Sequence, residues 1–136
     1  DKELQQGLEI HREYRNADDK VVNKVKIGEE VTVHLQLRSV DGQAHYNVAL
    51  IDLLPGGFEV VVDASRQQGG EWSPEYMDLR EDRVVLYGTF DKSAREFVYK
   101  IKATNKGSYV VPPVYAEGMY DRKLRYRGKG ATITVE

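Results

Sequence analysis

Few side chains in this sequence could do chemistry. Three histidines are present, and their spacing is not that of metal ligands: His11, His34 and His45. The acidic residues cluster where turns are expected, at Asp18–Asp19, Asp41 and Glu81–Asp82. The chain has no Gly-x-Ser-x-Gly elbow, no phosphate-binding glycine loop and no cysteine. We therefore expect no enzyme activity, no metal site and no cofactor. His34 is expected on the solvent side of a strand.

Met119 and Tyr120 follow a stretch in which two prolines interrupt an apolar run. Proline donates no backbone hydrogen bond, so Pro112–Pro113 fits a place where the chain leaves one sheet and enters another. Gly118 then permits a turn or bulge. Methionine and tyrosine are enriched at contact surfaces. Two interpretations stand: ordinary core residues of a strand, or a pair that a rigid strand presents to a partner.

Two other groups could bind a ligand. A basic run surrounds Tyr126: Arg122, Lys123, Arg125, Arg127 and Lys129. It could be a patch for an anionic partner, although the solvated side of an edge hairpin is the commoner use of such charge. Trp72 with Tyr76 could stack on a sugar, although the commoner use of such rings is to anchor a loop or core.

Alternation of apolar and polar residues predicts the elements that position these groups. It is clearest over Val31–Leu37 and Phe97–Ile101. Tyr46–Leu54 is the most apolar stretch, with Val48, Leu50 and, as a further candidate, Ile51 in the core. Other strands are expected over Gly7–Tyr14, Val21–Lys26, Phe58–Val62, Tyr76–Arg80, Arg83–Phe90, Ser108–Val111, Val114–Met119 and Ala131–Val135. Short strands with turn signals about every 8–12 residues predict an all-β antiparallel sandwich of immunoglobulin/fibronectin-like architecture.

The bulk composition narrows the class of protein. A chain of 136 residues suits one domain with one core, and residues 1–6 are expected to be linker. The net charge of -2 gives no support to nucleic-acid binding. No apolar run approaches the roughly 20 residues that span a membrane. The chain begins without Met or a signal pattern, so we expect a piece cut from a longer protein.

Four stretches, in order, carry a family resemblance: Tyr46–Glu59, Arg80–Val84, Phe97–Thr104 and Val111–Asp121. Each alone is a weak signal. Together, from about Gly7 to Val135, they resemble the final macroglobulin-like domain of bacterial alpha-2-macroglobulins. The resemblance implies a non-enzymatic domain of a periplasmic bait-and-trap inhibitor of many proteases, often a lipoprotein anchored to the inner membrane.

The resemblance also implies partners. These are the other domains of the same chain, target proteases captured by the full-length protein, and a penicillin-binding peptidoglycan synthase, with no nucleic acid and no membrane insertion of this domain. Many members carry a Cys-to-Gln thioester in a separate domain, and some lack it. Where it is present, the final domain packs against the thioester domain, and Met119 and Tyr120 would form a lid that keeps out the water that destroys a thioester. At least one of the two should then be exposed.

Two rival functions stay open. One is a module that binds cell-wall carbohydrate, which an exposed Trp72–Tyr76 platform would favour. The other is a purely structural spacer, which a surface with no apolar patch near Met119 would favour.

Overall fold

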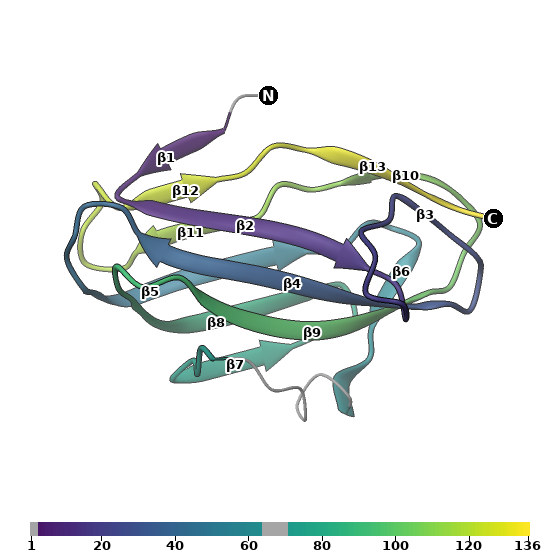
Figure 1. Cartoon of the computed structure of the whole chain (residues 1–136), viewed down its shortest axis with the longest axis horizontal. Coiled ribbons are helices and arrows are strands. Elements are labelled where there is room, and N and C mark those ends of the chain that lie inside the picture. The colour runs from purple at the N-terminus through teal and green to yellow at the C-terminus, as the bar shows by residue number, and fades with distance from the viewer. Residues whose placement is uncertain (1–2, 64–70) are drawn as a thin grey trace.

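The computed structural model describes residues 3–63 and 71–136 and shows a β-sandwich (Figure 1). One layer is a four-stranded sheet in the order β2 (Leu8–Arg15), β4 (Glu30–Ser39), β9 (Arg95–Ala103) and β6 (Phe58–Val60). Facing it is a six-stranded sheet in the order β1 (Leu4–Gln6), β12 (Arg125–Arg127), β11 (Tyr115–Gly118), β5 (His45–Leu53), β8 (Arg83–Phe90) and β7 (Tyr76–Leu79). A three-stranded sheet, β10 (Gly107–Val111), β13 (Ala131–Val135) and β3 (Lys24–Val25), continues the line of β11 and β12 (Figure 1). The named strands pair antiparallel except β13 with β3, so the predicted all-β antiparallel sandwich is confirmed.

The core lies between the layers, as the alternation predicted. Every second residue of β4 is buried: Val31, Val33, Leu35 and Leu37. The neighbouring β9 buries Phe97, Tyr99 and Ile101, and the opposite layer buries Val48, Leu50, Val84 and Leu86. Each fully buried aliphatic side chain of this kind stabilises the fold by roughly 1.5–3 kcal/mol relative to exposure.

The double proline lies where the chain changes sheets. β10 before it belongs to the three-stranded sheet, and β11 after it pairs with β5 in the six-stranded sheet. Arg12 Nη2 donates to the carbonyl oxygen of Pro112 at 2.8 Å, which fixes the crossing to the opposite layer. The predicted crossing is thus confirmed.

Several expected boundaries differ from the structure. Ile51 is half-buried on the outer face of β5, because Asp52 takes the inward position instead. The strand expected over Val21–Lys26 is reduced to β3. Residues 4–6, expected to be linker, form β1. The basic hairpin is not an edge, because β12 lies between β1 and β11. Most of the polar loop expected after Asp63 lies outside the described residues.

A buried charge joins the layers. Asp52 is fully buried, and its Oδ1 accepts from Arg12 Nη1 at 2.5 Å while its Oδ2 accepts from the Tyr99 hydroxyl at 2.5 Å. Both carboxylate oxygens are therefore satisfied by residues of the other sheet. The nearby Tyr14 hydroxyl is buried and has no hydrogen-bond partner in the described part of the chain. Burial raises the pKa of both Tyr14 and Tyr99 above the ordinary value.

Candidate functional site

Met119 and Tyr120 follow directly on β11 and face solvent. Met119 is 51% exposed and Tyr120 is 85% exposed. The interpretation as ordinary core residues is therefore wrong in this structure. The expectation that at least one of the two is exposed is confirmed. Contact of the pair with a thioester domain stays a prediction.

Backbone hydrogen bonds fix the loop that carries the pair. Met119 N–H donates to the Asn47 carbonyl at 2.9 Å, and Gly118 N–H donates to the Leu124 carbonyl at 3.0 Å. Leu124 N–H donates to the Asp121 carbonyl at 3.1 Å. A Cβ on Gly118 would lie 2.8 Å from the Asp121 carbonyl oxygen, so this tight turn needs glycine. Met119 and Tyr120 are thus presented by a loop closed at both ends.

Asn47 supports this loop from β5. It lies within a register shift between His45 and Val48 and has a φ of 61°, a left-handed conformation that asparagine tolerates better than most residues. The Tyr87 hydroxyl donates to Asn47 Oδ1 at 2.9 Å. The pKa of Tyr87 is raised, mainly by burial and to a smaller extent by the nearby Tyr120 hydroxyl. The sequence analysis missed Asn47, although asparagine within an otherwise apolar strand is the signal that could have revealed it.

The basic residues lie beside this loop, and none is buried: Arg122, Lys123, Arg125 and Arg127. Arg125 pairs across the strands with Glu117, and its Nε donates to the Arg122 carbonyl at 3.1 Å. Tyr126 between them is buried, and its hydroxyl donates to Glu3. β12 thus holds Arg125 and Arg127 on its exposed side, whereas Arg122 and Lys123 lie in the turn before it. Binding of an anionic partner there stays a prediction.

Trp72 and Tyr76 do not form a sugar-binding platform. Trp72 is 5% exposed and packs edge-on against Phe90 and Phe97, with ring centroids 5.8 and 6.2 Å away. Its Nε1 donates to the Thr89 carbonyl at 2.7 Å. Tyr76 is 58% exposed on β7. The core-anchor interpretation of Trp72 is therefore confirmed.

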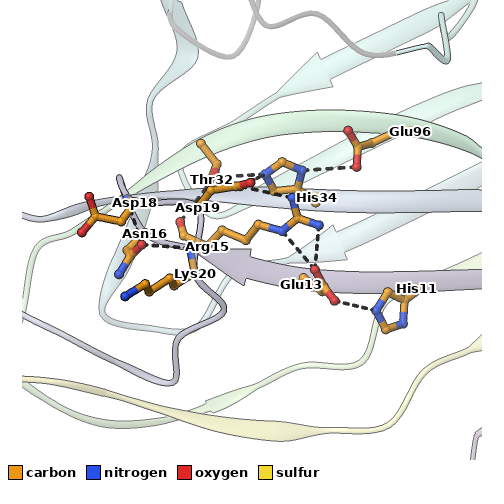
Figure 2. A network of polar contacts seen from close by, with 10 residues as sticks. All are labelled: His11, Glu13, Arg15, Asn16, Asp18, Asp19, Lys20, Thr32, His34 and Glu96. Carbon is orange, nitrogen blue, oxygen red and sulfur yellow. Dashed lines mark hydrogen bonds and ion pairs between the residues drawn. The ribbon is translucent and has the colours of Figure 1, made fainter.

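His11 and His34 lie beside carboxylates in a network of polar contacts (Figure 2). His34 Nδ1 lies 3.3 Å from Glu96 Oε2, and His11 Nε2 lies 3.0 Å from Glu13 Oε2. His34 is only 16% exposed, less than its predicted position implied, because neighbouring side chains enclose it. Among residues 3–63 and 71–136, no group of three or more His, Asp or Glu side chains could hold a metal ion.

A cavity of about 440 Å³ opens beside β2. Its lining mixes apolar side chains, including Ile10, Val114 and Ile133, with charged ones: Glu3, Arg12, Glu13 and Lys129. Arg12 already binds Asp52 and Pro112, so its main donors are not directed at a ligand. No helix within the described residues is long and apolar enough to cross a membrane.

Comparison with known proteins identifies the family. The sequence model described as the bacterial alpha-2-macroglobulin MG10 domain matches residues 7–122. An alpha-2-macroglobulin homologue of Yersinia pestis is 39% identical over 97% of this chain, which spans only 8% of that relative.

Solved structures share the fold. The native conformation of Escherichia coli alpha-2-macroglobulin superposes with a TM-score of 0.88 at 24% identity, covering 100% of this chain and 10% of that one. Salmonella alpha-2-macroglobulin reacted with methylamine superposes with a TM-score of 0.83 at 22% identity, covering 99% of this chain and 10% of that one. By sequence and by fold, the chain belongs to the MG10 domain family of bacterial alpha-2-macroglobulins.

Proposed function

We propose that this chain is the interaction domain of a periplasmic bacterial alpha-2-macroglobulin, and that its Met119–Tyr120 loop shields the thioester of a neighbouring domain. The observation that carries the proposal is two large exposed side chains on a loop held by the Asn47 and Leu124 backbone bonds. The domain has no catalytic role of its own. Capture of proteases, a lipid anchor in the inner membrane and association with a penicillin-binding synthase belong to the same proposal for the whole protein.

The chemistry of a thioester explains why such a loop is needed. A thioester is an activated acyl group, and water consumes it unless the site is kept dry. A thioether and an aromatic ring exclude water by contact. Leaving each side chain exposed costs roughly 1.5–3 kcal/mol relative to burial, and a partner recovers this when it covers them. Because the loop is already fixed, little conformational entropy is lost on docking.

The test uses the full-length protein that carries this domain, with Met119→Ala and Tyr120→Ala combined. Loss of the lid should raise the rate of thiol release by methylamine at least about tenfold, which corresponds to about 1.4 kcal/mol. Val110→Ala is the matched control, because Val110 is 69% exposed on β10, which belongs to a different sheet from the loop. A double variant that reacts at the wild-type rate would falsify the lid. A wild-type protein that releases no thiol would refute the thioester part of the proposal.

Neither rival function gains support from a specific observation. Burial of Trp72 removes the platform that the carbohydrate module required. The exposed Met119 and Tyr120 form the apolar patch that a plain spacer would lack.

A further inference from the structure

We propose that the outer face of the six-stranded sheet is an interdomain docking surface, covered by the same domain that covers the Met119–Tyr120 loop. This outer face is formed by side chains of β5, β8 and β11 that point away from the core: Ala49, Ile51, Val85, Tyr87 and Tyr115. The identity of the covering domain rests on the proposed function. The existence of the surface rests on the packing described below.

The two outer faces of the sandwich differ in chemistry. The outer face of the four-stranded sheet is covered by ion pairs, among them Arg38–Glu9 at 2.5 Å and Lys100–Glu30 at 3.4 Å, together with the network of Figure 2. Such a face is adapted to water. On the opposite layer, Ile51 and Val85 alternate with the buried residues of their strands and are themselves apolar. Strands that are apolar on both faces are typical of sheets covered on both sides.

The strand register makes this outer face continuous. Ala49 of β5 lies between Glu117 of β11 and Tyr87 of β8, and Tyr76 of β7 lies beyond Tyr87. In the neighbouring row, Ile51 lies between Tyr115 and Val85.

The outer face also reaches the loop. Tyr87 hydrogen-bonds to Asn47 Oδ1, and the Asn47 carbonyl accepts the Met119 amide. The outer face therefore adjoins the loop through Tyr87 and Asn47, so one partner can cover both. Its rows include two charged residues, Glu117 beside Ala49 and Asp78 beside Val85.

The occupant to which these observations point is another domain of the same polypeptide. Relatives in this family are about ten times longer than this chain, which spans 8% of the Yersinia pestis homologue and 10% of the Escherichia coli structure. The partner should be apolar opposite Ile51 and Val85. It should carry acidic groups opposite β12, because Arg125 and Arg127 border the face on that side.

The test places a benzophenone photo-crosslinking amino acid in the full-length protein at Val85, at Tyr76 and at Tyr120, one at a time. Tyr76 serves as a second position because it is 58% exposed and already aromatic, so its replacement perturbs folding least. Gln36 is the control position, on the exposed side of β4 in the charged layer. We expect Val85, Tyr76 and Tyr120 to crosslink to peptides of one and the same other domain, at a yield at least fivefold above that of Gln36.

Three results would overturn the inference: yields at Val85 and Tyr76 no higher than at Gln36, crosslinks to a second copy of the protein, or crosslinks to a domain other than the one that Tyr120 reaches. These outcomes are separate from the methylamine test of the lid. If the Met119→Ala, Tyr120→Ala protein keeps its methylamine rate while Val85 and Tyr120 crosslink to one domain, the shielding role fails and the docking surface stands.

Discussion

Replacing Arg12 by methionine should destabilise the fold more than an ordinary surface change would. Arg12 is the cation that faces the buried Asp52, and it also donates to the Pro112 carbonyl at the crossing between sheets. In Arg12→Met, the Asp52 carboxylate keeps only the Tyr99 hydroxyl as a described donor. The carboxylate would then be a buried charge without its counter-charge.

The magnitude follows from the burial. Removing one partner of a buried ion pair costs about 3–5 kcal/mol, and a lost hydrogen bond to the Pro112 carbonyl adds about 1 kcal/mol. Domains of this kind are stable by only about 5–15 kcal/mol. We therefore expect the melting temperature of the chain to fall by about 10–20 °C.

Urea denaturation followed by fluorescence measures this change. The chain has one tryptophan, Trp72, and it is buried against Phe90 and Phe97, so its emission reports loss of the core. The matched control is Arg12→Met combined with Asp52→Leu, which removes both charges and should be more stable than Arg12→Met alone. A loss below about 1 kcal/mol for Arg12→Met, or a double variant less stable than the single one, would refute the reasoning.

Three further predictions concern the core tyrosines and the loop. Because burial raises the pKa of Tyr14 and Tyr99, the folded state keeps protons that the unfolded state loses. Stability should be complete below pH of about 10 and fall above it by up to about 1.4 kcal/mol per pH unit for each tyrosine, which urea titrations from pH 8 to 11 would measure. At pH 7, Tyr14→Phe should change stability by less than about 1 kcal/mol, whereas Tyr99→Phe should cost about 1–3 kcal/mol by removing a donor from Asp52; equal losses would contradict this. Gly118→Ala should lower the free energy of unfolding by about 1–3 kcal/mol, because the new methyl group meets the Asp121 carbonyl. Hydrogen exchange of the Met119 amide should become faster in this variant. Unchanged exchange would argue against a tight turn.

The sandwich could be predicted because burial on one side of a strand leaves a period of two in the sequence. Val31 to Leu37 shows this period, and the structure buries those positions. The sheet crossing at Pro112–Pro113 was also predictable, because a missing donor excludes the middle of a sheet. The inward Arg12 stem fits the alternation of β2, although its partner could not be named from the sequence.

The rest depends on contacts between residues distant in sequence. Alternation from Val48 and Leu50 points the side chain of position 52 inward. It does not show that Arg12 and Tyr99 reach this carboxylate from the other layer. Asn47 supports the candidate loop through a left-handed turn and a bond to Met119, neither of which leaves a periodic signal. Exposure of Met119 and Tyr120 needed the structure, since their residue types suit a core equally well.

The chain changes sheets twice at the same place, between β10 and β11 and between β12 and β13, and this has a mechanical consequence. β10 pairs with β13 and β11 pairs with β12, and Gly128 N–H donates to the Val114 carbonyl at 2.9 Å where the chain bends. The two strand pairs thus form one ribbon that runs from the Met119–Tyr120 loop to Val135 at the opposite end of the domain (Figure 1). In Figure 1 this ribbon runs along the length of the sandwich. Because hydrogen bonds join its strands on both sides of the bend, we expect the ribbon to resist bending between the loop and Val135.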